Sequence, residues 1–161
     1  MKPQDYLTDT KITVLLNTLD FQLNEIQRQQ DHEQQIFQWA MSFLLTLFGA
    51  IMALFGVTTT TQFPVIIKIL ASVIVVFPIV FSMYWIFRLS AQAVNNAIAA
   101  ERIQSFLLLF HPNYYGPEAL YPQEWRGNLA KDIRKRRTPL YYAITMVMMT
   151  ACLEISIWTL L

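Results

Sequence analysis

Few side chains in this 161-residue sequence have the types and spacing that catalysis or metal binding requires. The histidines His32 and His111 are far apart in the chain, and the one cysteine, Cys152, lies within an apolar run. The sequence has no HExxH or GxSxG motif and no glycine-rich phosphate-binding loop. We therefore expect a protein that is not an enzyme and that needs no metal or other cofactor.

Two charged residues, Lys68 and Glu154, stand out because they interrupt long apolar stretches. A charge at the centre of a membrane helix costs about 3 kcal/mol on insertion scales, so such a side chain normally faces protein or water. At about 1.5 Å per residue, Lys68 and Glu154 would lie roughly 6 and 10 Å from the outer ends of their stretches. They are expected to form a charged pair, within or between subunits. The alternatives are a ring of Glu154 side chains that lines a pore, and a Lys68 that reaches the outer interface alone.

The charge content of the whole chain predicts an all-α integral membrane protein. Hydrophobic residues make up 55% of the sequence and charged residues 14%, whereas an average soluble domain has about 25% charged residues. No Lys, Arg, Asp or Glu occurs at positions 34–67 or 69–87, and Glu154 is the one such residue after Arg137. Stretches like these argue against a soluble enzyme and against direct nucleic-acid binding.

Three segments have the length of about 20 residues that a helix needs to cross a bilayer. They are residues 36–57, 64–87 and 139–161. The short link 58–63 predicts that the first two segments form a tight hairpin. Pro64 suits the first turn of the second helix, and Pro78 within it is expected to cause a kink.

The distribution of basic residues predicts the orientation in the membrane. Residues 88–138 contain eight Lys and Arg, and the hairpin link contains none. Because basic loops stay in the cytoplasm, residues 1–35 and 88–138 are placed there and the C-terminus is placed outside. Five of the eight form a basic cluster that sets topology and is compatible with contact to anionic lipid head groups. This basic cluster consists of Lys131, Arg134, Lys135, Arg136 and Arg137.

The cytoplasmic segments are expected to form a helical stalk. A heptad seam before the first span predicts a coiled-coil face, and it comprises Ile12, Leu16, Leu19, Leu23 and Ile26. No Pro or Gly interrupts residues 4–48, so one helix is predicted to run from the stalk into the first span. The second span is predicted to continue to residue 110, where His111 and Pro112 end it. The basic return segment that follows is either a packed connector or, through its aromatic residues, a binding surface.

A stripe of small residues follows one face of the first span, and such stripes allow close helix packing in lipid. Its members are Ser42, Thr46, Gly49, Ala53 and Gly56. The stripe suits packing either within one subunit or between subunits of an oligomer.

The layout of residues 9–110, an N-terminal helix, a two-span hairpin and a helical extension, resembles the small membrane effectors of bacterial anti-phage defence, such as the SLATT group. This resemblance implies an oligomer that permeabilises the inner membrane when a cytoplasmic signal is sensed. The third span with Glu154 departs from the two-span pattern, and no diagnostic motif accompanies the layout.

Two functions are consistent with these observations. The first is a homo-oligomeric pore or ion channel that is gated through its cytoplasmic part, with Lys68 and Ser72, Glu154 or the small stripe facing water. The second is a non-conducting anchor or scaffold that holds a cytoplasmic partner through its stalk. The expected partners are membrane lipids, further copies of the chain, and a cytoplasmic regulatory protein or small signalling ligand.

Overall fold

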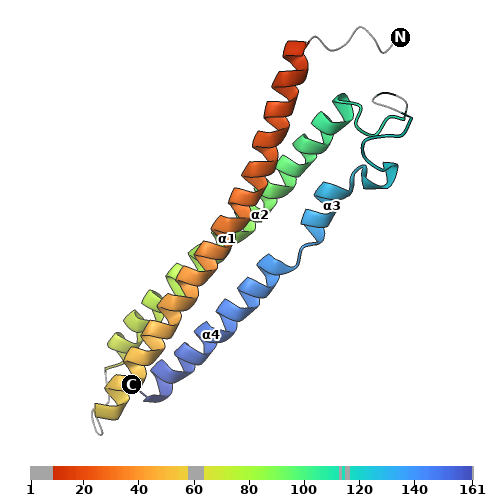
Figure 1. Cartoon of the computed structure of the whole chain (residues 1–161). Helices are drawn as coiled ribbons and strands as arrows, with labels where there is room; N and C mark the ends of the chain where they lie inside the picture. Colours follow the sequence, from red (N-terminus) through yellow and green to blue (C-terminus); the bar gives the residue numbers. More distant parts are fainter. Residues whose placement is uncertain (1–8, 58–63, 113, 115–116, 161) are drawn as a thin grey trace. The chain divides into compact units, whose positions relative to one another are not determined.

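Helices form all of the regular secondary structure in the part of the chain that the structure describes. The structure is a computed structural model, and it describes residues 9–57, 64–112, 114 and 117–160. Figure 1 shows the elements in chain order, and the all-α prediction is confirmed. They are α1 (Asp9–Val57), α2 (Val65–Phe106), the 3₁₀ helix η2 (Gln123–Trp125), α3 (Asn128–Lys135) and α4 (Thr138–Leu160).

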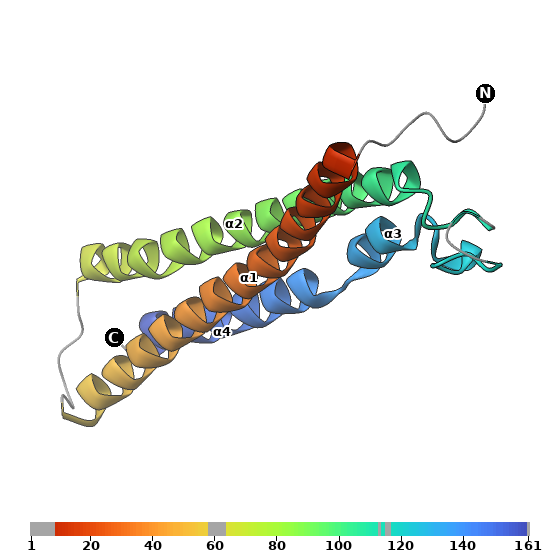
Figure 2. The ribbon, with the colours of Figure 1, turned by 45° about the horizontal axis from the view of Figure 1, so that its top comes forward.

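Three of these helices, α1, α2 and α4, are long and apolar enough to cross a membrane. They contain 49, 42 and 23 residues. The bounds of α1 confirm the predicted unbroken helix that begins before the first span, and α2 continues through Pro78 (Figure 2). Residues 58–63, which were predicted to close a tight hairpin, lie outside the described residues.

The end of α2 differs from the prediction, because the helix stops at Phe106 and not at residue 110. Leu108 has a φ of 56°, in the left-handed region that usually terminates a helix at glycine. Its N–H donates to the Ser105 carbonyl at 3.2 Å, and the Leu109 N–H donates to the Gln104 carbonyl at 3.3 Å. This is the Schellman pattern of helix termination. The return segment is hydrogen-bonded to the residues that follow α2, since the Tyr121 N–H donates to the Leu109 carbonyl at 3.0 Å.

The chain forms two compact units. The apolar unit consists of residues 32–88 and 137–161, and it holds α4 together with parts of α1 and α2. The polar unit is formed by the described residues up to Asp31 and by residues 89–136, and it holds η2, α3 and the remaining parts of α1 and α2.

The apolar unit is held together by one core to which α1, α2 and α4 all contribute. The Phe37 and Tyr142 rings stack at its edge with centroids 4.2 Å apart. The buried side chains of the core are Ala40, Leu44, Ile51, Val75, Ile79, Ile86, Met146, Leu153 and Ile157.

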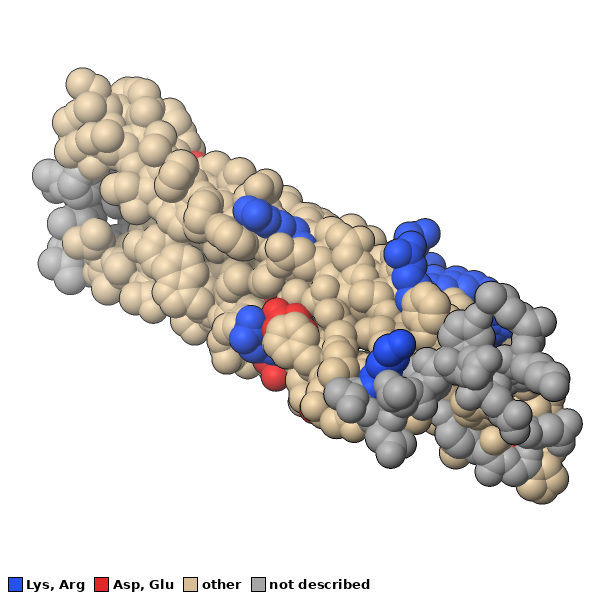
Figure 3. Space-filling model, turned by 90° about the horizontal axis from the view of Figure 1, so that it is seen from above, with Lys and Arg blue, Asp and Glu red and all other residues tan. Residues whose placement is uncertain are grey.

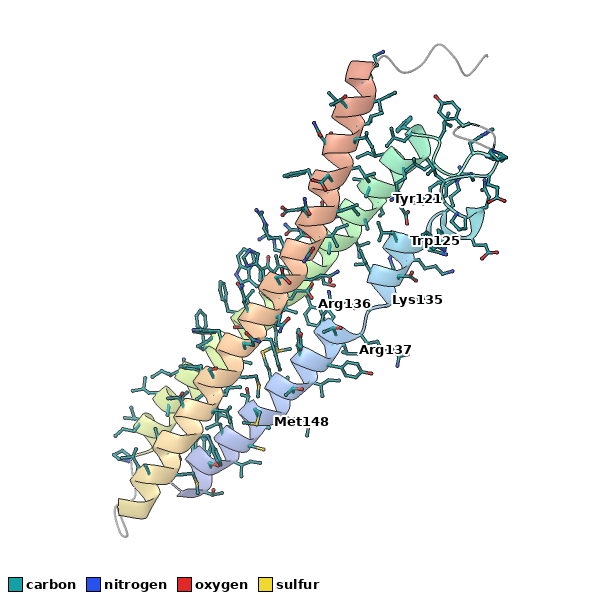
Figure 4. All side chains as sticks on the ribbon, viewed as in Figure 1. Tyr121, Trp125, Lys135, Arg136, Arg137 and Met148 are labelled. Atoms are coloured by element: carbon teal, nitrogen blue, oxygen red, sulfur yellow. The ribbon has the colours of Figure 1, made fainter. Side chains whose placement is uncertain are left out.

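Many other apolar side chains of this unit point outward. Phe77 on α2 is 70% exposed and Met148 on α4, labelled in Figure 4, is 65% exposed. Large areas of the face drawn in Figure 3 carry no charged side chain. Extensive apolar surface of this kind is characteristic of helices that face lipid.

The polar unit packs α1 against α2 through small and aliphatic side chains, and its buried face differs from the predicted seam. Leu19 and Ile26 are buried as predicted, but Leu16 and Leu23 are 49% and 40% exposed. Leu15, and not Leu16, packs with Ile12 against the buried cluster of Leu19, Ala100 and Leu107. The contact face of α1 therefore keeps three of the predicted seam residues, Ile12, Leu19 and Ile26. The buried residues of α2 here include the closely spaced Ala93, Ala97 and Ala100, which allow the helices to approach closely.

We expect Leu44→Ala to destabilise the apolar unit by about 2–5 kcal/mol, because it removes a fully buried side chain and leaves a cavity among three helices. The measurement is reversible unfolding of the detergent-solubilised protein, followed by circular dichroism. Leu45→Ala is the matched control, since Leu45 is exposed on the same helix and its truncation should cost far less. Equal losses for the two variants would contradict the packing described here.

Candidate functional site

The central polar feature of the apolar unit is a hydrogen bond between α2 and α4. The Ser72 hydroxyl donates to Glu154 Oε2 at 2.6 Å. The other carboxylate oxygen, Glu154 Oε1, is also buried, and it has no hydrogen-bond partner among the described residues. One oxygen of the Glu154 carboxylate is therefore satisfied within the chain, and the other has no donor among the described residues.

Helix register explains why Ser72 rather than Lys68 meets Glu154. Ser72 is eight residues beyond Pro64, or about 12 Å along the helix, close to the roughly 10 Å between Glu154 and the end of the chain. Lys68 precedes Ser72 by one turn, is half-buried, and forms no ion pair with Glu154 within the described chain. A Lys68–Glu154 pair between subunits, the other form of the hypothesis, stays a prediction.

The small stripe lies on the outside of the apolar unit. Its members Ser42, Thr46, Gly49 and Ala53 are all exposed, whereas the burial of Gly56 is outside the described residues. They lie on the face of α1 opposite to the buried Leu44 and Ile51. A Cβ atom added at Gly49 would meet no atom within 4 Å. These four residues therefore do not pack within one subunit, which was one of the two predicted roles of the stripe. Packing between subunits stays a prediction.

The predicted basic cluster lies at the end of the polar unit and at the start of α4. Lys131, Arg134 and Lys135 are exposed on α3, and Arg136 and Arg137 form the extended connection to α4 (Figure 4). The start of α3 is held by Glu101 of α2, whose Oε1 accepts a hydrogen bond of 2.9 Å from the Ala130 N–H. Contact of the cluster with anionic lipid stays a prediction.

The polar unit contains an amide-rich groove that sequence analysis missed. Gln22 and Gln29 continue the buried face of α1, and Gln29 is 7% exposed. Their Oε1 atoms are buried without a hydrogen-bond partner in the described chain. The groove has a volume of about 410 Å³ and is also lined by Glu25, Arg28 and three amide residues of α2. The detectable signal was the alternating spacing of three and four residues through Leu19, Gln22, Ile26 and Gln29.

A second groove of the polar unit gathers the aromatic residues of the return segment. The Tyr121 ring lies between the Phe110 and Trp125 rings in tilted contacts, with ring centroids 5.8 and 6.0 Å away. Together with the exposed Leu23 they line a volume of about 460 Å³, and Tyr121 and Trp125 are labelled in Figure 4. The segment is therefore packed against α2 and also presents a recess to a partner.

We expect the Ser72 hydroxyl and the Glu154 carboxylate to be coupled by about 0.5–2 kcal/mol, the range for hydrogen bonds between membrane helices. A double-mutant cycle with Ser72→Ala and Glu154→Leu measures this coupling through reversible unfolding in detergent. The matched control replaces Ser72→Ala with Ser156→Ala, because the Ser156 hydroxyl donates within its own helix, to the Cys152 carbonyl. Additive effects in the Ser72 cycle would contradict the observed contact.

The geometry of these sites has no counterpart in the comparisons with known proteins. Within the described residues, no group of three or more His, Cys, Asp or Glu side chains is placed to hold a metal ion. No protein-family model, no curated protein and no solved structure matches this chain.

Proposed function

We propose that this protein is inserted in a membrane through α1, α2 and α4 and that several copies assemble into a pore or ion channel. The observation that carries this proposal is the carboxylate of half-buried Glu154, which has one oxygen bonded to Ser72 and the other buried without a partner in the described chain. Ionisable groups in this setting typically mark paths for ions or protons, because water or a cation supplies the missing interaction.

Self-association is supported by the exposed small stripe. In lipid there is no hydrophobic drive between helices, so association depends on close packing of faces such as Gly49 and Ala53. The chain itself packs α1 and α2 of the polar unit through a comparable set of alanines, Ala93, Ala97 and Ala100. The exposed stripe on α1 is suited to the same kind of packing with a second copy.

A role as a membrane-permeabilising effector of anti-phage defence is the biological form of this proposal. It is supported by the resemblance in layout to the SLATT group. The cytoplasmic part would then control the pore, and the amide-rich groove, with its two unsatisfied glutamine oxygens, is suited to a small polar ligand that donates hydrogen bonds.

The second candidate is a non-conducting anchor for a cytoplasmic partner, and the aromatic groove favours it. Trp125 is exposed next to Tyr121, and aromatic residues of this kind dominate the binding energy of protein interfaces. The anchor predicts a dry bundle of spans, whereas the pore predicts an ionic current.

We expect the purified protein to produce a cation current in planar bilayers that Glu154→Gln lowers by at least about fivefold. This factor corresponds to about 1 kcal/mol, the attraction of two unit charges in contact in water. Glu118→Gln is the control, because Glu118 is an exposed carboxylate of the polar unit and its charge should not affect the current. A folded oligomer that conducts no ions would reject the pore and favour the anchor.

We expect Gly49→Leu to weaken self-association by about 1–3 kcal/mol, the usual cost of overpacking, without unfolding the single chain. Space around Gly49 is open within one subunit, so the larger side chain would clash only with a second copy. Analytical ultracentrifugation in detergent measures the effect. The adjacent exposed Ala50, about 100° around the helix, provides the control Ala50→Leu. If both variants keep the wild-type oligomer, the small stripe is not the interface.

A further inference from the structure

An apolar groove of about 450 Å³ lies between α1 and α2 within the apolar unit. Its walls are aromatic and aliphatic, with Trp39 and Ile36 on α1 and Phe81 and Trp85 on α2. Ser82 in its floor is 3% exposed, and its hydroxyl donates to the Pro78 carbonyl at 2.8 Å. Since the one hydroxyl in the floor is already bonded, the groove offers an apolar occupant almost only van der Waals contact.

Polar donors are present at one end of the groove. Arg88 lies one turn beyond Trp85, and its Cζ atom is 5.1 Å from the centroid of the Trp85 ring. This cation–π contact holds an exposed guanidinium beside the apolar lining. Arg88 itself is outside the lining, whereas Gln35 lines the groove and carries an amide donor. The Gln35 Oε1 lies 3.3 Å from His32 Nδ1.

We propose that this groove binds one anionic phospholipid, with an acyl chain between Trp39 and Trp85 and the phosphate at Arg88 and Gln35. Arg88 and Gln35 directly flank the predicted spans, at the level where lipid phosphates lie, and the tryptophans lie where interfacial aromatic residues concentrate. Guanidinium groups bind phosphate through charge-assisted hydrogen bonds, which accounts for the preference for an acidic head group. The inference rests on membrane insertion of the apolar unit but not on ion conduction.

The lipid site is tested by tryptophan fluorescence in proteoliposomes. In a Trp125→Phe/Trp158→Phe background, Trp39 and Trp85 are the reporters. Bilayers of phosphatidylcholine are doped with a small fraction of either phosphatidylglycerol or phosphatidylcholine that carries bromine on its acyl chains. We expect the brominated phosphatidylglycerol to quench the reporters with about fivefold higher apparent affinity than the brominated phosphatidylcholine. About fivefold is the gain in affinity that one basic residue provides at an anionic membrane surface.

Arg88→Gln should abolish this preference and Arg88→Lys should retain part of it. Arg137→Gln is the matched control, because it removes an exposed positive charge from the connection that precedes α4 and not from the groove. If Arg137→Gln lowers the preference as much as Arg88→Gln does, the preference is a diffuse charge effect and the proposal is wrong. Equal quenching by the two lipids would mean that the tryptophans contact only the non-specific annular lipid around the protein, and this result would also overturn the proposal.

A protein that keeps Trp158 alone separates failure of the site from failure of insertion. Quenching of Trp158 by both lipids, without quenching of Trp39 and Trp85, would show an inserted protein whose groove is covered by another chain, against the proposal. No quenching of any tryptophan would reject membrane insertion itself, and with it both this inference and the pore. Because the assay reads no current, a non-conducting protein can still bind the lipid.

Discussion

Three helices that meet along one line can each bury only a narrow face, and the apolar unit is built around this constraint. Leu44, Ile79 and Leu153 represent the buried face of α1, α2 and α4, and most of the remaining apolar side chains point outward. An apolar exterior of this extent is characteristic of helices that face lipid. The scarcity of charge along these helices, the outward small stripe and the aromatic lining beside Arg88 are all consistent with that environment.

The same constraint makes the few buried polar groups informative. A polar atom in this core has few neighbours, so each one must be satisfied by its own helix, by the next helix or from outside the chain. The Ser82 hydroxyl donates a hydrogen bond within its own helix, and the Ser72 hydroxyl donates one to Glu154 on the next helix. Glu154 Oε1 has no partner among the described residues. Glu154 therefore shares with Gln22 and Gln29 of the polar unit a buried oxygen that no group of the described chain satisfies.

Sequence patterns predicted the long helices well because their signals extend over many residues. Uncharged runs defined the spans within α1 and α2, and the absence of glycine and proline at 4–48 and 89–110 predicted the helical extensions of these spans. The end of α2 could not be predicted, since a leucine at 108 adopts a conformation usually reserved for glycine. The seam of α1 differs from the prediction at Leu16 and Leu23. Leu15 and Leu16 are adjacent and equally apolar, and the glutamines that complete the observed face carry no hydrophobic signal. The Ser72–Glu154 contact depends on the register between two helices, which sequence periodicity does not determine.

The connections between the two units differ in stiffness. The chain passes from one unit to the other three times, twice inside the uninterrupted helices α1 and α2 and once through the extended residues Arg136 and Arg137. A helix has no soft joint that could absorb torsion, whereas a change of dihedral angle at one or two residues can serve as a hinge. Twist applied to α1 or α2 in the polar unit would thus be carried into the apolar unit along the same helix, whereas α4 would receive it only through side-chain packing and the Ser72–Glu154 hydrogen bond.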